Sequence, residues 1–525
     1  MRFLKPFLVF THLALTMIAS SASPRRVAIV GAGAAGSSAA YFIQEELLAH
    51  GEQPAEIHVF ERSNLVGGRA RVGTVEYNNR TLYFEQGASM FISKNFHLME
   101  MTSKFNLTLC QHPCTYAKGD GGHTTAKLLE SSLGSYGIWD PEDLRGSGRW
   151  IVGPGNNWRL LDALKALWRY SGPGDYSHVQ KRTRTAVDEF LQSYKVFNDT
   201  STIYSTWEEY LSDKPLLQSS LYYSAYEYYL SAKEGVRRKF LEEVVSLATR
   251  VNYMQDIDKV NSLGAHISMA AGSDAAYSIA GGNYQIFDRM LASSASHLHL
   301  NTSIAEIQRS NKTTGTYTVL TRSNDVYDEF DSVIIAAPLS LANISVIENK
   351  YQDHTEYVHM YVTFAIGTLR NDLFPKGKIP RLVVTPYKTT KPFNCLSILA
   401  CLGSEELNSS RQCRDGPVLV KMFSHKRIDL EKIFAKVEWH HEQEWHSYPK
   451  LKPLNAGFVQ QDPQSTAYYL HRSLPPPIIL DRRDSNNGVY YINGMEALFS
   501  TMESQTVAAK NVIRLALFGT PNSTI

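Results

Sequence analysis

The apolar and polar positions near the start of the chain predict a strand, a helix and a second strand. Residues 27–44 read VAIVGAGAAGSSAAYFIQ, and the apolar run IHVF at 57–60 ends at Glu61. A continuous apolar run bounded by glycine is typical of a buried parallel strand, and the small residues after it suit a closely packed helix. The pattern therefore predicts the first strand–helix–strand unit of a parallel sheet.

Two later segments carry elements that would complete the same sheet. Gly281-Gly282-Asn283 leads into a helix-like run, two strands flank a turn at 311–315, and the apolar strand SVIIAAP occupies 332–338. Residues 488–517 give a strand, a turn and a helix with a long apolar face. We therefore predict an α/β protein with a discontinuous Rossmann-type domain. Its three segments are residues 24–110, 281–345 and 485–518.

The other segments, 111–280 and 346–484, predict an inserted α+β domain that would bind the substrate. The first is helical in pattern from about 156, and the second is rich in strands from 350 to 450. Tyr222, Tyr226 and Tyr229 recur at helical spacing, and we favour a core position for them over the wall of an apolar tunnel.

Composition narrows the class of partner. The chain has 525 residues, enough for more than one substantial core, and its 53 basic and 51 acidic side chains give a net charge of +2. No basic tract stands out, so we expect neither a nucleic acid nor an anionic membrane surface as partner. The five cysteines are few for a disulfide scaffold, and an odd count leaves at least one free thiol.

The N-terminus predicts entry into the secretory pathway. Residues 1–22 combine Arg2 and Lys5, an apolar stretch and small residues, the three parts of a signal peptide. No other stretch is as apolar, so we expect no integral membrane segment after its removal. Eight Asn-x-Ser/Thr sequons support this route. The expected destination is a lysosome, a vacuole or the outside of the cell.

Three glycines between the first strand and helix indicate a dinucleotide site. Gly31 allows the tight turn, Gly33 lets the backbone approach a pyrophosphate, and Gly36 lets helix and strand pack closely. The helix N-terminus offers unpaired N–H groups to the phosphates. Glu61 lies twenty-five residues past Gly36, near the spacing at which a carboxylate binds the ribose hydroxyls.

The residues after Glu61 indicate which dinucleotide is bound. Arg62 is followed after four residues by Gly67-Gly68-Arg69, which resembles the second FAD signature of the amine oxidase and phytoene desaturase group. The glycines there permit close approach, and a planar guanidinium can donate two hydrogen bonds to a pyrophosphate. We therefore expect FAD as the cofactor, with Arg62, Gly68 and Arg69 among its contacts.

Beyond these motifs, the chain resembles the prenylcysteine oxidase family, also called prenylcysteine lyases, over almost its whole mature length. The similar blocks are FLEEVVSLATRVNYMQDIDKVNSLGAHISM from 240, GGN from 281, VKMFSHKRI from 420, WHSYPKLKP from 445 and YYINGMEALFSTMESQTVAAKN from 490. The resemblance implies an FAD-dependent thioether oxidase. Such enzymes cleave farnesyl- or geranylgeranyl-cysteine with O₂ and water to the prenyl aldehyde, cysteine and hydrogen peroxide.

The resemblance also assigns residues in the second half of the chain. Glu496 matches an acid that binds the ribityl or pyrophosphate region, and an amide near Met502 would face the flavin N1/O2 edge. Ile304 matches the strand position whose backbone contacts adenine. The sequence offers no candidate acid–base pair, and hydride transfer to a flavin requires none.

Other interpretations remain open at this stage. His440, His441 and His446 do not fit a zinc-protease helix, so we expect a solvated polar face and no metal. Ile92-Ser93 stands where the family often has His-Pro, which leaves open another apolar thioether as substrate. The alternatives are another FAD oxidase, such as an amine oxidase or a polyene desaturase, and a flavoprotein that binds isoprenoids without turnover.

Overall fold

The structure of the protein is a computed structural model. The described residues are 23–111, 116–119, 136–142, 148–153, 168–454 and 476–519, apart from gaps at 171, 200, 232, 272–274, 312, 314, 348–352, 378, 403–415 and 484–486. The predicted signal peptide lies outside the described residues.

The centre of the nucleotide-binding half is a six-stranded sheet whose strands come from three distant segments. Its order is β11 (His297–His299), β2 (Glu56–Phe60), β1 (Arg26–Val30), β15 (Ser332–Ile335), β23 (Gly488–Tyr491) and β22 (Ile479–Arg482). The first five strands are parallel and β22 is an antiparallel edge. The mixed α/β, Rossmann-type fold is thus as predicted, and the third segment joins the sheet earlier than residue 485.

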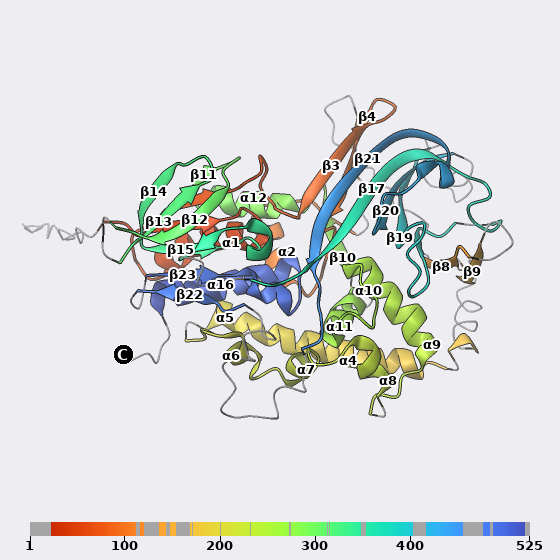
Figure 1. Ribbon diagram of the computed structural model, residues 1–525, viewed down its shortest axis with the longest axis horizontal. Helices are drawn as coiled ribbons and strands as arrows, with labels where there is room; N and C mark the ends of the chain where they lie inside the picture. Colours follow the sequence, from red (N-terminus) through yellow and green to blue (C-terminus); the bar gives the residue numbers. More distant parts are fainter. Residues whose placement is uncertain are drawn as a thin grey trace, which may run out of the picture.

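Both faces of this sheet are covered, which explains why its strands are apolar on both sides. One face packs on α1 (Ala34–Ala49), α12 (Tyr284–Ser293) and α16 (Met502–Phe518). The other packs on a small sheet of β14 (Val326–Phe330), β13 (Tyr317–Thr321), β12 (Ile304–Arg309) and β16 (Ser345–Val346), with α13 (Leu339–Ala342) nearby. Figure 1 shows these layers at the left of the view.

The second half contains a seven-stranded sheet and a helical floor. The sheet order is β21 (Phe434–Pro449), β17 (Tyr357–Leu369), β20 (Pro417–Ser424), β19 (Cys395–Cys401), β18 (Leu382–Val384), β8 (Tyr136–Asp140) and β9 (Arg149–Val152). The long strands β17 and β21 arch over the right of Figure 1.

The helices of this half occupy the lower part of Figure 1, with α10 and α11 nearest its middle. They are α4 (Gly174–Leu191), α5 (Lys195–Asn198), α6 (Trp207–Leu211), α7 (Pro215–Ser219), α8 (Ala225–Leu230), α9 (Arg238–Phe240), α10 (Ser246–Tyr253) and α11 (Ser262–Ala270). A π-helical turn, Leu241–Val245, joins α9 to α10.

Two three-stranded sheets and one helix connect the halves. One sheet is β3 (Arg71–Glu76), β4 (Arg80–Gly87) and β7 (Tyr116–Gly119). The other is β5 (Phe91–Ile92), β10 (Ala276–Ile279) and β6 (Leu109–Gln111), and α2 (Phe96–Lys104) lies between β5 and β6 in the sequence.

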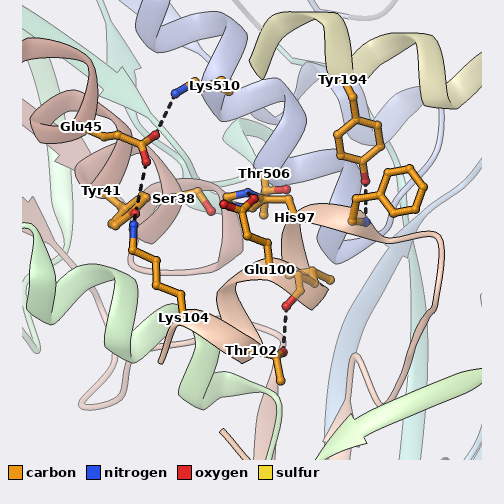
Figure 2. A network of polar contacts seen from close by, with 12 residues as sticks. Ser38, Tyr41, Glu45, His97, Glu100, Thr102, Lys104, Tyr194, Thr506 and Lys510 are labelled. Carbon is orange, nitrogen blue, oxygen red and sulfur yellow. Dashed lines mark hydrogen bonds and ion pairs between the residues drawn. The ribbon is translucent and has the colours of Figure 1, made fainter. Parts of the chain in front are cut away.

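A polar network joins α1, α2 and α16 beside the helical core (Figure 2). Lys510 of α16 donates to Glu45 of α1 at 2.9 Å, and Lys104 of α2 reaches the Tyr41 hydroxyl, which itself donates to Glu45 at 3.2 Å. The network holds these three helices side by side.

One feature differs from the sequence-based expectations. Helix α8 begins at Ala225, so Tyr222 precedes it and the three tyrosines do not form one helical stripe. Tyr229 is buried in the core, as favoured. His440, His441 and His446 lie on strand β21, in the segment predicted to be rich in strands.

Candidate functional site

A single cavity of about 1180 Å³ borders both halves of the molecule. Its polar part is lined by the loops after β1 and β2, and its apolar part by side chains of α4, α7 and α11. Pockets for one drug-sized ligand are usually smaller than about 1,000 Å³. The volume therefore suits an extended cofactor together with a second, apolar ligand.

The glycines of the first loop differ in what they allow. At Gly36 a Cβ atom would stand 1.8 Å from the Gly31 carbonyl oxygen, and Gly31 itself has φ of +105°. At Gly33 a Cβ would meet no atom nearer than Gly68 Cα at 3.6 Å, an ordinary contact. Gly31 and Gly36 are thus required by the turn and the helix packing. Gly33 leaves room at the N-terminus of α1, where a pyrophosphate would bind.

The second glycine motif lies against the first. Gly67 N–H donates to the Ala32 carbonyl at 2.8 Å, and Gly67 forms a parallel bridge with Gly33. Gly68 has φ of +60°, a conformation that a side chain would strain. The two motifs, thirty-odd residues apart, therefore form one glycine-lined wall of the cavity.

Glu61 is held in place by its own neighbours. Its side chain is buried at the end of β2 and accepts hydrogen bonds from Ala32 N–H at 2.9 Å and from Ser63 N–H and Oγ at 2.8 Å each. Arg62, the next residue, is exposed and lines the cavity. Glu61 thus sits beside the first glycine loop, at the position expected for a ribose ligand.

Arg69 and Glu496 form an ion pair at the cavity wall, in which the Glu496 side chain is buried and the Arg69 side chain is 29% exposed. Arg69 contacts Glu496 directly and donates to the Ser447 carbonyl at 2.9 Å. Glu496 also accepts from Tyr357 Oη at 2.9 Å and from Asn493 Nδ2 at 2.8 Å. Burial opposes the charge on Arg69, but Glu496 outweighs it and raises the Arg69 pKa. Both oxygens of Glu496 are used, so in this structure the carboxylate positions Arg69.

The remaining two assigned residues also line the cavity. Met502 is the first residue of α16, whose N-cap Thr501 accepts from Ser504 N–H at 3.0 Å. The positive end of a seventeen-residue helix therefore borders the cavity at Met502. Ile304 is buried at the start of β12, on the nucleotide side.

The apolar part of the cavity lies over the helical floor. Leu98, Phe190, Leu217, Leu263 and Ile267 line it, and they come from α2, α4, α7 and α11. Ile92 lines the cavity as well, so the position that departs from the family pattern faces the candidate site. None of Tyr222, Tyr226 and Tyr229 is among the lining residues.

Two buried ionisable residues in the cavity were not assigned from the sequence. Lys421 on β20 donates from Nζ to the Glu85 main-chain oxygen at 2.9 Å and to Ser89 Oγ at 3.1 Å. Glu85 accepts from Asn283 N–H at 2.6 Å through Oε1, and its Oε2 has no partner. Burial raises the Glu85 pKa to about 8 and lowers the Lys421 pKa to about 8. Lys421 could have been found from the sequence, because it is a charged residue inside the otherwise apolar strand PVLVKMFS.

The described residues include no cluster of three or more His, Cys, Asp or Glu side chains placed to bind an ion. The described helices likewise include none that combines the length and apolar character needed to cross a bilayer.

Comparisons with known proteins show the family to which the chain is similar. The prenylcysteine lyase family matches residues 155–519, and a NAD(P)-binding Rossmann-like domain matches 29–105. Farnesylcysteine lyase of Arabidopsis thaliana is 27% identical over 515 residues, covering 94% of this chain and 88% of that protein. Human prenylcysteine oxidase 1 is 25% identical over 526 residues, covering 94% and 89%.

The fold also has a solved counterpart. The structure of wild-type putrescine oxidase bound to putrescine aligns with a TM-score of 0.53 and 13% identity, over 94% of this chain and 98% of that one. At that identity the likeness concerns the fold alone.

Proposed function

Because this chain belongs to the prenylcysteine lyase family, we propose that it is an FAD-dependent thioether oxidase acting on farnesyl- or geranylgeranyl-cysteine. The observation that carries the proposal is the cavity, which is continuous from the glycine loops to an apolar pocket. The polar end fits the ADP part of a dinucleotide, since Gly33 leaves space beside the α1 N-terminus and Glu61 lies next to it. FAD is favoured over NAD because Gly67-Gly68-Arg69 resembles an FAD signature. Gly67 lies beside the first glycine loop, and Arg69 contacts Glu496.

The proposed reaction combines the thioether, O₂ and water. The carbon between sulfur and the prenyl double bond loses a hydride, water adds to that carbon, and the adduct breaks its C–S bond to give the aldehyde and cysteine. FAD, when bound, supplies the acceptor for the hydride and reduces O₂ to hydrogen peroxide. The contribution of this chain is to hold the allylic carbon in place and to keep the apolar pocket dry.

The N-terminus of α16 is placed to assist. Met502 and the capped first turn of α16 present partial positive charge to the cavity, which would stabilise negative charge on a reduced flavin. Arg69, fixed by Glu496, would bind the pyrophosphate or ribityl region through its remaining donors.

We also propose that the protein works in a secretory compartment, a lysosome, a vacuole or the outside of the cell. Cys110 and Cys401 are disulfide-bonded and Cys395 is a free buried thiol, and disulfides persist in oxidising compartments. Six of the sequon asparagines fall on described residues, and all six are exposed: Asn79, Asn106, Asn198, Asn301, Asn311 and Asn343.

The test is anaerobic stopped-flow absorbance of the FAD-loaded protein mixed with farnesylcysteine. We expect the flavin band to bleach, and to recover on admission of air with formation of farnesal and hydrogen peroxide. S-decylcysteine is the matched control, because its saturated chain has no allylic C–H and should leave the band unchanged. Bleaching by an amine but by neither prenylcysteine would indicate an amine oxidase. Binding of prenyl compounds without bleaching would indicate a carrier.

A further inference from the structure

Lys421 is a buried lysine that lines the cavity and has only neutral hydrogen-bond acceptors. It lies on β20 and is 7% exposed. Its Nζ donates to the Glu85 main-chain oxygen at 2.9 Å and to Ser89 Oγ at 3.1 Å. Within the described part of the chain, no ion pair joins Lys421 to a carboxylate. The proposed reaction makes no use of this amine.

The other buried lysines of the described residues are bound differently. Lys214 Nζ lies 2.5 Å from Asp213 Oδ1, and Lys510 Nζ lies 2.5 Å from Glu46 Oε1 and 2.9 Å from Glu45 Oε2. Carboxylates therefore oppose the charges of Lys214 and Lys510, whereas the surroundings of Lys421 offer no such compensation.

The two acceptors suit the neutral form of the Lys421 amine. A neutral amine has two N–H donors and one lone pair, whereas an ammonium group has three donors. Both donors of the neutral form are used, so its lone pair remains for a bond to another atom. Burial acts in the same direction and lowers the pKa of Lys421 to about 8, although the nearby Glu85 and Cys395 oppose this shift.

The surroundings of the amine are otherwise apolar. Nζ lies 5.0 Å from the ring centroid of Phe423, which also lines the cavity, and 5.8 Å from that of Phe364. A ring face attracts an ammonium group, but this attraction is smaller than the cost of burying its charge. A lysine amine that is kept neutral in apolar surroundings is a nucleophile toward carbonyl compounds.

We propose that Lys421 binds the prenyl aldehyde product covalently, as a reversible imine. Nζ forms a bond to the carbonyl carbon, the C=O bond breaks, and the oxygen leaves as water with the two protons of the amine. Addition of water reverses the step and releases the aldehyde. The inference rests on the proposed function for the identity of the aldehyde, whose apolar chain would occupy the pocket over α4, α7 and α11.

Such a site would hold the aldehyde after cysteine has left, in a way that depends on pH. Imine formation consumes the neutral amine, so we expect release to become faster as pH falls below about 8. The titratable groups near the amine are Glu85 on β4 and Cys395 on β19. Burial raises the Glu85 pKa to about 8, so Glu85 takes up its own proton over the same range.

The test supplies the aldehyde directly. The FAD-loaded protein is mixed at neutral pH with farnesal and sodium cyanoborohydride, which reduces an imine to a stable amine, and the adducts are located by peptide mass spectrometry. An amine of lowered pKa has a larger neutral fraction than a lysine in water. We therefore expect the Lys421 adduct to form at least about tenfold faster than an adduct at Lys432, whose side chain is 77% exposed.

Lys510 is the buried control in the same digest. Its side chain is 5% exposed and paired with two carboxylates, so it should remain unmodified. Absence of a Lys421 adduct, or its formation no faster than that at Lys432, would overturn the proposal without reference to a variant.

A competitor and two variants then assign the adduct to the cavity. Farnesol has the same apolar chain without the carbonyl group, so it should slow the reaction of Lys421 and leave that of Lys432 unchanged. Lys421→Arg should lose the Lys421 adduct alone. Lys432→Arg is the matched control and should keep it. A Lys421 adduct that forms equally fast with excess farnesol would contradict a site beside the prenyl chain.

The pH dependence distinguishes the buried amine from an ordinary one. Nα-acetyllysine in the same mixture is the reference, because an unperturbed lysine has a pKa of about 10.4. The ratio of the Lys421 adduct to the reference adduct should be constant below about pH 8 and should fall above it. A ratio that stays constant to about pH 10 would contradict an amine held in its neutral form.

These results do not depend on whether the protein oxidises prenylcysteine, since farnesal is supplied ready-made. A Lys421 adduct in a protein whose flavin stays oxidised with farnesylcysteine would refute the proposed function and leave the carbonyl site standing. Flavin bleaching by farnesylcysteine without any Lys421 adduct would do the reverse.

Discussion

Two carboxylates at the cavity, Glu61 and Glu85, differ in how many of their oxygens accept hydrogen bonds. Glu61, on the nucleotide side, accepts hydrogen bonds from Ala32 N–H and from Ser63 N–H and Oγ. Glu85, on the substrate side, has one oxygen bound by Asn283 N–H and the other without a partner. The hydrogen bonds of Glu61 are thus completed by the chain itself, whereas Glu85 keeps one oxygen without a partner among the described residues.

The largest effect should come from valine at the two glycines of the first loop. Gly36→Val should abolish folding of the nucleotide half, since even a Cβ would stand 1.8 Å from Gly31 O. Gly33→Val should leave the fold intact, because a Cβ there makes only ordinary contacts, but should weaken FAD binding at least about tenfold. Circular dichroism and flavin absorbance separate the two outcomes. A Gly33→Val protein purified with full flavin would show that the loop does not hold a pyrophosphate.

The next effect concerns the pair that fixes Arg69. Glu496→Gln should lower the free energy of unfolding by about 3 kcal/mol, since it leaves a guanidinium without its counter-charge at a site where the Glu496 side chain is 1% exposed. Urea unfolding measures the change. Glu356→Gln, in an ion pair with Lys450 whose side chains are 52% and 44% exposed, is the control and should cost less than about 1 kcal/mol. Equal costs for the two variants would contradict the structural role given to Glu496.

Two neighbouring buried groups should give stability opposite pH dependences. Burial raises the Glu503 pKa from 4.5 to about 7. The contribution of this shift to the free energy of unfolding is therefore complete below pH 4.5 and is lost as pH rises to 7. Burial lowers the His97 pKa from 6.5 to about 3. The contribution of this shift to the free energy of unfolding is therefore complete above pH 6.5 and is lost as pH falls to 3. Each slope is about 1.4 kcal/mol per pH unit.

Substitution separates these two slopes. Glu503 accepts from His97 N–H at 2.8 Å and from Leu98 N–H at 3.1 Å, and His97 lies near the centre of Figure 2. In urea unfolding over the two pH windows, Glu503→Gln should remove the loss toward neutral pH and His97→Gln the loss toward acid. Curves that keep the original pH dependence in both variants would contradict this account.

The smallest effect tests the apolar part of the cavity. Leu263→Phe adds volume to a wall residue of α11 and should shorten the space for a prenyl chain. We expect KM for geranylgeranylcysteine to rise about tenfold and KM for farnesylcysteine about twofold or less. Farnesylcysteine in the same variant is the internal control. An equal rise for both substrates would indicate general damage and not a length limit.

The two sides of the cavity also differ in how far the sequence predicts them. The nucleotide loops depend on local geometry, because Gly31, Gly33 and Gly36 lie in the same strand–helix–strand unit as Glu61. Their spacing alone therefore predicts the fold of this unit. The Glu85–Lys421 contact joins residues 336 positions apart, and no spacing encodes it. The sheet of β3, β4 and β7 packs against the seven-stranded sheet and brings the two residues together, and that packing is tertiary.

The incorrect expectation about the tyrosines has the same cause. Tyr222 was grouped with Tyr226 and Tyr229 because a local spacing of three and four suits a helix, but Ser224 caps α8 and starts it after Tyr222. Glu496 stays a predicted cofactor contact. Its hydrogen bonds with Tyr357 and Arg69 join residues far apart in the sequence, so no local spacing predicts them.

The central claim is that the carbon next to sulfur gives up a hydride to a flavin held by this chain. Farnesylcysteine deuterated at C1, mixed anaerobically with the FAD-loaded protein, tests that bond directly. The account predicts flavin bleaching that is severalfold slower than with the undeuterated compound, at saturating concentrations of both. Bleaching at the same rate with both, or none with either, would contradict it.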